Sequence, residues 1–478
     1  MSSSPLTTYS LPFSPLERWL LLLLPIGVAA CILAGVYAPT VLLLAVIALF
    51  AAIFLERPYE LLLVMVFLIP FNFVFAIGPV PIAVELLKLF LWIPFLVTRT
   101  ARADFKTSTY NKWFAVWAFI LATSVIRSND LPYTIKESIR LASNIGLCYL
   151  VLNLVDTREK LLQILRVLTM STLLVACYGF YQWAIQDYGA LFWIVNPRID
   201  TNLAHYRDTF WPWRNRMISV LTSEMELGHY FNMCLPIGLM LWLTEGRKRL
   251  SSKWFWSVLA MLAGLLLTFT FGAWAALPAT MGLFVVVLDK KLRWKLLGGV
   301  LVISVVSGLL IMGPLRPFAE TKFSGQQIGS FTWDIFTRLK AWTFAVNTWR
   351  SHPMLGVGVG SYETISAESD WLGVGPMGAG SSPHETYLYL LAESGLIGFI
   401  SMMAIFISSI RRNLEPRFGL IGVALAFSIA VNLMGGFSDD SGFNGPHASY
   451  LLWLVIGLSE ALRSLTPALQ VRMERAPT

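Results

Sequence analysis

One histidine stands where a helix is expected to begin. The segment Ser382-Pro383-His384-Glu385-Thr386-Tyr387-Leu388 leads into an apolar run. Ser382 and Glu385 fit a Ser-x-x-Glu capping box, with Pro383 at the first helical position. His384 would then lie in the first turn, where the positive end of the helix dipole disfavours imidazolium and free N–H groups favour an anion. A neutral imidazole beside an anion site is suited to general base catalysis.

The histidines do not predict a metal site. A metalloprotease HExxH motif would need a second histidine at the position of Leu388. The remaining histidines show no ligand-like spacing on a helix; they are His205, His229, His352 and His447. We therefore expect no metal and no cofactor, and Glu385 is explained more simply as a helix cap than as a catalytic group.

Two arginines occur upstream, in Trp211-Pro212-Trp213-Arg214-Asn215-Arg216. Guanidinium groups bind phosphate through paired, charge-assisted hydrogen bonds, and the indoles beside them can stack on sugar rings. Aromatic residues next to arginine are also common at any membrane interface, so both interpretations stay open. Ser223 and Glu226 form a second capping box, which gives Glu226 a structural explanation too.

Two other patterns carry little chemistry. The stretch from Leu355 to Gly360 reads GxGxG, without the GxGxxG spacing or the βαβ unit of a dinucleotide site, and predicts a tightly turning loop. Asp439 and Asp440 lack the alternating oxygen ligands of a calcium loop and are expected to be solvated.

The composition tells which kind of protein must position these residues. The 478 residues are 56% hydrophobic and only 13% charged, and the mean hydropathy is +0.65. A soluble chain of this size needs more charge to cover its surface, so the sequence predicts an integral membrane protein. The net charge of +8 does not indicate nucleic-acid binding, because the basic residues lie in short clusters between apolar spans.

The apolar runs predict an all-α polytopic membrane protein. A bilayer core needs about 20 apolar residues per helix, and twelve to fourteen such spans can be counted. Their expected starts are Trp19, Pro39, Leu61, Pro81, Lys112, Ile139, Leu161, Glu226, Trp254, Ala273, Leu296, Tyr387, Gly419 and His447. The first of these is expected to be retained and not cleaved as a signal peptide.

Basic residues in the short loops predict the topology. Clusters such as Lys290, Lys291, Arg293 and Lys295 fall on one side of the predicted spans, which puts both termini in the cytoplasm. We expect a single integral membrane domain over 1–478, with long outer loops at 187–225 and 313–385. Ile335, Leu339, Trp342, Val346 and Trp349 follow helical spacing and predict an amphipathic helix at about 334–350, which lies on the membrane surface or packs on neighbouring helices.

Several of these motifs together resemble the bacterial O-antigen ligase and polymerase family. The stretch from Arg338 to Gly358 is similar to that family's helix followed by a "Pro, two apolar residues, Gly-x-Gly" turn. Pro383 to Leu388 and Ala392 to Gly398 resemble its His-Asn-x-x-Leu and Glu-x-Gly-x-x-Gly motifs, and Arg216 to Gly228 resembles an earlier segment that enters a helix. The resemblance covers roughly residues 214–398.

The chain departs from the family pattern at two places. Relatives commonly show Ser-Arg-Gly where this chain has Thr270-Phe271-Gly272, so an arginine expected near the donor is absent. They show His-Asn where this chain has His384-Glu385. These departures imply either that the donor phosphate is held differently from that of relatives or that the activity is altered.

The resemblance implies a metal-independent membrane glycosyltransferase of the GT-C type. Its donor would be an undecaprenyl-diphosphate-linked glycan, its acceptor a lipid or glycan hydroxyl, and its product a cell-envelope polysaccharide such as lipopolysaccharide, made on the periplasmic face of the bacterial inner membrane. His384 would be the base, and Arg216 would neutralise the leaving diphosphate. Substrate-binding residues would be Arg214, Arg338, Glu226 and Tyr387. Ligase and polymerase remain equally open.

A transporter of a small ion or sugar is the alternative function. Some relatives carry a bicarbonate-transporter label, and Glu85, Lys88 and Glu393 are intramembrane charges that a pathway would use. A structural subunit of an envelope assembly is a third possibility. The unusual polar residues are concentrated in the expected outer loops and not at mid-membrane, which favours the transferase.

Overall fold

The structure is a computed structural model. It describes residues 58–71, 75–77, 80–82, 105–128, 130–185, 216–221, 223–287, 328–369 and 382–474. In chain order its elements are α3 (Pro58–Leu68), β1 (Phe75–Ile77), β2 (Val80–Ile82), α5 (Asn111–Arg127), α6 (Leu131–Leu154), α7 (Arg158–Ile185), α10 (Glu224–Thr244), α11 (Lys253–Leu267), α12 (Phe271–Val287), α15 (Ile328–Ser351), α16 (Ser361–Glu368), α17 (Thr386–Asn413), the 3₁₀ turn η1 (Pro416–Phe418), α18 (Gly419–Gly435), α19 (Ser441–Asn444) and α20 (Pro446–Glu474).

The protein is an all-α polytopic membrane protein, as the sequence predicts. Within the described residues, four helical stretches are long and apolar enough to cross a bilayer, namely Arg158–Ile185, Thr386–Asn413, Pro416–Gly435 and Pro446–Leu465. Shorter apolar helices occur at Pro58–Leu68, Lys253–Leu267 and Phe271–Phe284. In the part of the chain that the structure describes, the two short strands pair with each other and with no other strand, in antiparallel orientation.

Most of the predicted spans coincide with helices. The starts expected at Leu61, Lys112, Ile139, Leu161, Glu226, Trp254, Ala273, Tyr387, Gly419 and His447 fall within α3, α5, α6, α7, α10, α11, α12, α17, α18 and α20. Pro81, where a span was expected to start, lies in β2, so no helix begins there, and residues 83–104 lie outside the described residues. The starts at Trp19, Pro39 and Leu296 lie outside the described residues.

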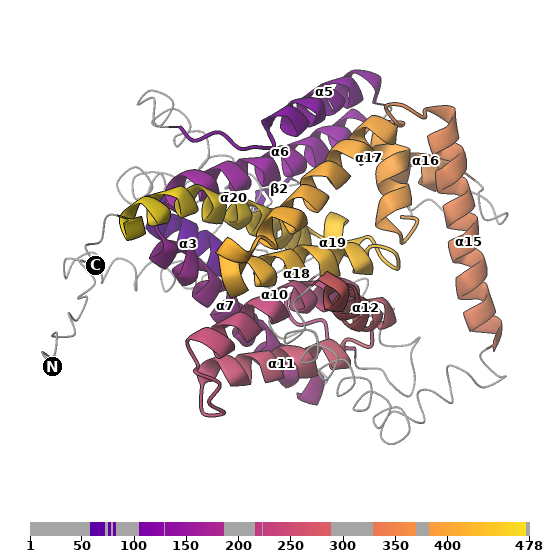
Figure 1. The fold of residues 1–478 in the computed structure, drawn as a ribbon. Coiled ribbons are helices and arrows are strands. Elements are labelled where there is room, and N and C mark those ends of the chain that lie inside the picture. Colours follow the sequence, from indigo (N-terminus) through magenta and orange to yellow (C-terminus); the bar gives the residue numbers. More distant parts are fainter. Residues whose placement is uncertain are drawn as a thin grey trace, which may run out of the picture.

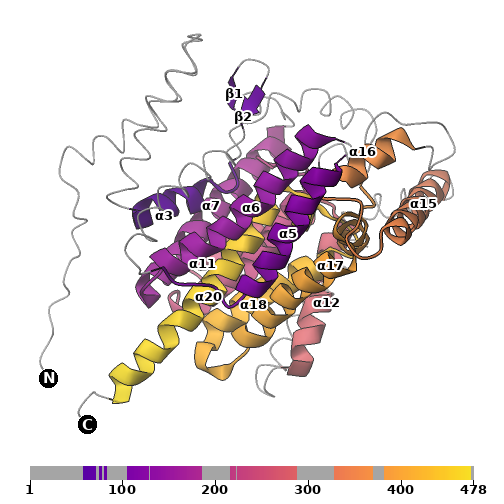
Figure 2. The same cartoon turned by 90° about the horizontal axis from the view of Figure 1, so that it is seen from above.

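The centre of the bundle is α10, which packs against α7, α11, α12, α18 and α20. On its other side α20 lies along α6, and Figures 1 and 2 show this pair running through the middle of the molecule. Gly457 of α20 lets the two backbones approach, because a Cβ there would meet the Cα of Cys148 at 3.0 Å. Small residues at helix contacts are typical of membrane bundles, where close packing replaces the hydrophobic effect.

Helix α17 is broken at Gly395, which has a left-handed φ of 63°. The break frees backbone groups that lipid cannot satisfy, and the GxGxG segment supplies their partners. Val357 N–H donates to Ala392 O and Gly358 N–H to Glu393 O, both at 2.9 Å, while Leu396 N–H donates to Pro353 O at 2.9 Å. The predicted tight turn is thus present, and it completes the broken helix.

The long predicted outer loops are described only in part. Residues 187–215 lie outside the described residues, and the second loop contains α15 and α16. The helix expected at about 334–350 falls within α15, which packs against α17 at the edge of the bundle (Figure 1).

Candidate functional site

His384 lies in the loop just before α17 and not in its first turn. The helix begins at Thr386, and Glu385 is its N-cap, with the carboxylate accepting Leu388 N–H. The predicted capping box from Ser382 is therefore wrong. The hydroxyl of Ser382 instead donates to Asp440 and accepts His384 N–H. His384 itself has a left-handed φ of 49°, which interrupts any helix at this residue.

The imidazole of His384 faces a buried carboxylate. Its Nδ1 lies 3.7 Å from Oδ2 of Asp439, and the side chains are 44% and 4% exposed. This is an ion-pair distance, somewhat longer than a hydrogen bond. The arrangement places an accessible imidazole against an acid that is shielded from water.

The two partners shift each other's pKa. The contact with Asp439 raises the pKa of His384, although burial and the nearby guanidinium of Arg338 act in the opposite direction. Burial would raise the pKa of Asp439, but the contact with His384 and the Ser441 hydrogen bonds hold that pKa below its usual value. The direction for His384 is opposite to the one expected from the helix end, because a carboxylate outweighs the helix dipole at this range.

The expectation that Asp439 and Asp440 are solvated is wrong. They are only 3% and 6% exposed, because the loop between α18 and α19 folds back under His384. Asp440 accepts hydrogen bonds from the Ser382 hydroxyl at 3.0 Å and from Asn444 at 2.8 Å. Burial and the charge of Asp439 raise the pKa of Asp440.

His384, Asp439 and Asp440 could also hold a metal ion, since one ligand atom from each lies within 4.8 Å of the others. Both oxygens of Asp440 already accept hydrogen bonds from protein groups. Oδ1 of Asp439 accepts Ser441 N–H at 2.7 Å. These bonds occupy three of the four carboxylate oxygens, while Oδ2 of Asp439 has no hydrogen-bond partner among the described residues and faces the imidazole of His384.

A second histidine lies behind Asp439. His229 of α10 is fully buried, and its Nε2 is 4.0 Å from Oδ1 of Asp439. Neither ring nitrogen makes a well-formed hydrogen bond to a described residue. Gly435 leaves room for the ring, since a Cβ there would meet its Cε1 at 2.2 Å. Sequence reasoning missed this neighbour because α10 and the α18–α19 loop are far apart in the chain.

Arg216 reaches the start of α10. Its Nη1 pairs with Oε1 of Glu224 at 2.7 Å, and the side chains are 15% and 2% exposed. The hydroxyl of Ser223 accepts Glu226 N–H, so the second predicted cap forms on that side. Arg214 lies outside the described residues.

The segment Thr270-Phe271-Gly272 lies between Glu224, the ion-pair partner of Arg216, and the loop that carries Asp439. Thr270 Oγ1 donates to the carbonyl of Glu224 at 3.2 Å. A Cβ on Gly272 would meet Oγ of Ser438 at 1.9 Å, so this glycine packs directly on the loop that carries Asp439. Phe271, which stands where an arginine was expected, is 43% exposed and packs edge-on against Trp274.

Arg338 approaches from α15. Its Nη1 donates to the carbonyl of Ser438 at 2.8 Å, one residue before Asp439. Arg338 therefore contacts the Ser438–Asp440 loop directly. Arg216 is linked to that loop indirectly, through Glu224 and the segment that starts α12.

The other predicted substrate-binding residues are engaged within the protein. Glu226 is fully buried and accepts the backbone N–H groups of His447 and Ala448 at the start of α20, at 2.7 and 3.3 Å. The hydroxyl of Tyr387 donates to Leu433 O at 2.6 Å. Its ring packs 4.6 Å from that of Phe437, which is 60% exposed and precedes the Asp439 loop.

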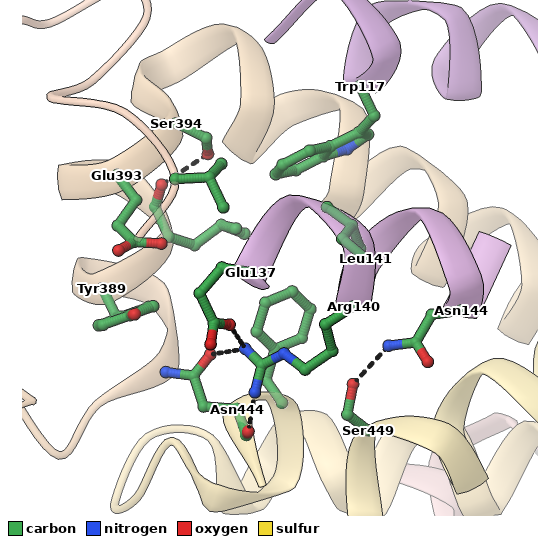
Figure 3. Close-up of a pocket in the computed structure, with 13 residues that line it drawn as sticks. Trp117, Glu137, Arg140, Leu141, Asn144, Tyr389, Glu393, Ser394, Asn444 and Ser449 are labelled. Carbon is green, nitrogen blue, oxygen red and sulfur yellow. Dashed lines mark hydrogen bonds and ion pairs between the residues drawn. The ribbon is translucent and has the colours of Figure 1, made fainter. Parts of the chain in front are cut away.

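Glu393 lies in a separate polar cluster in the bundle (Figure 3). Its carboxylate accepts Gly360 N–H at 2.9 Å, next to an ion pair of Glu137 and Arg140 at 2.5 Å. Arg140 in turn donates to the carbonyl of Asn444. The cavity between these groups has about 30 Å³, which holds water but not a sugar. Glu85 and Lys88 lie outside the described residues.

Residues 256–403 match the family model described as O-antigen ligase. This region resembles the O-antigen ligase family, and the match covers less than a third of the chain. The resemblance seen in the sequence is thereby confirmed, and the matched region contains α12, α15, the GxGxG turn and His384. Arg216 and Asp439 lie on either side of it. No curated protein matches the chain.

Proposed function

We propose that this protein is a membrane glycosyltransferase that moves a glycan from an undecaprenyl-diphosphate carrier to an acceptor hydroxyl. The observation that carries the proposal is the pairing of half-exposed His384 with buried Asp439, in a chain whose central region matches the O-antigen ligase family. Family membership supports polysaccharide biosynthesis in a membrane. The choice of donor, acceptor and GT-C-type chemistry is our inference.

In the proposed reaction His384 is the general base. The Asp439 carboxylate accepts a hydrogen bond from Nδ1–H, which keeps Nε2 unprotonated and able to take the proton of the acceptor hydroxyl. The acceptor oxygen attacks the anomeric carbon, and the bond from that carbon to the phosphate oxygen breaks. The bonding electrons leave with the lipid diphosphate, and attack from the opposite side inverts the anomeric centre.

Arg216 and Arg338 would stabilise the departing diphosphate. Two guanidinium groups can bind phosphate oxygens directionally, so no metal ion is needed to neutralise the developing charge. Glu224 fixes Arg216 through its ion pair, and the Ser438 carbonyl fixes Arg338. Arg214 is proposed as a further phosphate ligand from the sequence alone.

Tyr387 and Glu226 have different proposed roles. Together with exposed Phe437, the Tyr387 ring offers an aromatic face beside the Asp439 loop, on which a sugar of the donor or acceptor could stack. Glu226 is buried and bound to the start of α20. We propose that it supports the site by holding α10 against α20.

We propose that the reaction takes place on the periplasmic side of the bacterial inner membrane, with both termini in the cytoplasm. The support is the distribution of basic residues: Arg411 and Arg412 lie at the last turn of α17, opposite the end that carries His384. A compartment without nucleotide sugars suits a lipid-linked donor.

The transporter alternative rests on Glu393, and its surroundings weigh against it. The carboxylate is held by Gly360 N–H, within the turn that completes the broken helix. A cavity of about 30 Å³ beside it does not form a route for an ion or sugar. We therefore propose a structural role for Glu393.

Envelope glycans of a strain that lacks the protein test the proposed function. Loss of a ligase leaves completed chains on the lipid carrier, whereas loss of a polymerase leaves single repeat units. Either result supports the transferase and distinguishes its two forms. Unchanged glycans would refute it.

A further inference from the structure

Two side chains of α15 hold the loops that carry the proposed base and its acid. Nε1 of Trp342 donates to the carbonyl of Pro383 at 3.1 Å. One turn earlier, Nη1 of Arg338 donates to the carbonyl of Ser438 at 2.8 Å. Each of these carbonyls belongs to the residue immediately before one member of the His384–Asp439 pair.

The His384 loop needs such a restraint. A non-glycine residue with positive φ is held in a sparsely populated conformation, which persists only when its surroundings fix it. His384 has φ of 49°. Its loop is held by the Ser382 hydroxyl, which bonds to Asp440 and to His384 N–H, and by Thr386 N–H, which donates to Gly436 O. The indole of Trp342 adds a bond from a different helix, and α15 packs along α17 (Figure 2).

We infer that α15 acts as a clamp that sets the distance between His384 and Asp439, and that Trp342 is a positioning residue for the proposed transfer reaction. The inference rests on the proposed function, because it assigns to Trp342 an effect on the base. Trp342 acts through the backbone of Pro383 and need not touch the substrate.

The chain provides a matched control in Trp349. This residue lies on the same helix, and its Nε1 also donates to a proline carbonyl, that of Pro353, at 3.1 Å. That proline belongs to the turn at Gly395 and not to the His384 loop. Trp342→Phe and Trp349→Phe thus remove the same kind of hydrogen bond from the same helix. Of the two, only Trp342→Phe removes a bond to the loop that carries His384.

The experiment compares both variants in proteoliposomes that contain a lipid-diphosphate-linked glycan and an acceptor. We expect Trp342→Phe to lower kcat about tenfold, the equivalent of one lost hydrogen bond, with KM for the donor unchanged. Trp349→Phe should keep kcat within about twofold of the parent protein, as expected where a hydrogen bond does not bear on the reacting groups. Rates are taken per folded molecule, as measured by monodisperse elution in detergent.

The pH profile separates positioning from general damage. The charged groups that face His384 are Asp439 and Asp440 from the α18–α19 loop and Arg338 from α15, and His229 of α10 faces Asp439. A looser His384–Asp439 contact weakens the stabilisation of imidazolium, so the acid limb of kcat should move to lower pH in Trp342→Phe and stay in place in Trp349→Phe.

Three outcomes decide the inference. A parent-like kcat and pH profile in Trp342→Phe would overturn it, and so would equal losses in both variants. If Trp342→Phe does not accumulate folded, Trp342→Tyr replaces it under the same criteria. The double variant Trp342→Phe/Asp439→Asn should have a kcat little lower than that of Asp439→Asn alone. If the losses of kcat in the two single variants instead added fully in the double variant, that result would also contradict the clamp. Activity of His384→Ala is measured alongside, because its retention would refute the proposed function itself.

Discussion

His384 Nδ1 and Asp439 Oδ2 lie 3.7 Å apart, although one residue precedes α17 and the other follows α18. The two helices pack against each other, so their neighbouring ends bring an accessible imidazole to a buried carboxylate. The Asp439 carboxylate raises the pKa of His384, and the contact with His384 in turn helps to hold the pKa of Asp439 below its usual value. This relationship gives the first prediction.

Replacing Asp439 by Asn should shift the pH dependence of transfer. A carboxylate stabilises imidazolium, so its removal lowers the pKa of His384, and the base becomes unprotonated at lower pH. The acid limb of the kcat profile should therefore move to lower pH. The plateau rate should fall by about 100-fold, since the imidazole is also less well oriented. An unshifted acid limb in Asp439→Asn would show that the carboxylate does not act on the base.

Arg216 and Glu224 allow binding to be separated from folding. Arg216→Gln alone leaves the carboxylate of Glu224 buried without its partner, at a cost of about 3–5 kcal/mol of folding free energy. The double variant Arg216→Gln/Glu224→Gln removes both charges and should recover folded protein. We expect the double variant to remain deficient in glycan transfer, because the diphosphate has lost a guanidinium. Thermal unfolding in detergent and a transfer assay measure the two effects, and recovery of both together would limit Arg216 to a structural role.

Gly395 should not tolerate a side chain. Its φ is 63°, and a Cβ would lie 2.4 Å from the backbone carbon of Met354. Gly395→Ala is expected to lower the melting temperature and to displace the turn that closes the broken helix, at a cost of about 1–3 kcal/mol from the backbone conformation alone. Gly282 in α12 is the control, because no heavy atom of a described residue lies within 4 Å of a Cβ placed there. Gly282→Ala should leave stability unchanged or slightly higher, and equal losses in the two variants would contradict the packing described.

Single cysteines at Gly378, in the predicted second outer loop, and at Arg411, in the last turn of α17, test the proposed orientation. A membrane-impermeant thiol reagent should label Gly378→Cys from outside in intact cells depleted of outer membrane. Arg411→Cys, in the last turn of α17, should react only after the membrane is permeabilised. The reverse pattern would place the His384 end in the cytoplasm and would exclude a periplasmic reaction.

More of the fold than of the candidate site could be predicted from the sequence. Apolar runs locate helices such as α7, α17, α18 and α20 because bilayer thickness sets their length. Helix boundaries are less certain. Ser382 appeared to be a cap, but its hydroxyl bonds to Asp440, a tertiary contact that no local pattern contains.

The site combines residues that sequence spacing does not connect. His384 was singled out because the Ser-x-x-Glu pattern put it at the start of a helix, and the structure places it just before α17. Asp439 and His229 were missed because their relation to His384 depends on the packing of α10, α17 and α18. The GxGxG turn was recognised as a turn, but its pairing with Gly395 is likewise set by tertiary structure.

The most direct test of the account is glycan transfer by His384→Ala in proteoliposomes that contain a lipid-diphosphate-linked donor. The control is His352→Ala, which removes an exposed imidazole next to α15. We predict that His384→Ala folds normally and loses transfer, while His352→Ala transfers glycan at the parent rate. Full transfer by folded His384→Ala would contradict the central claim that this imidazole is the base.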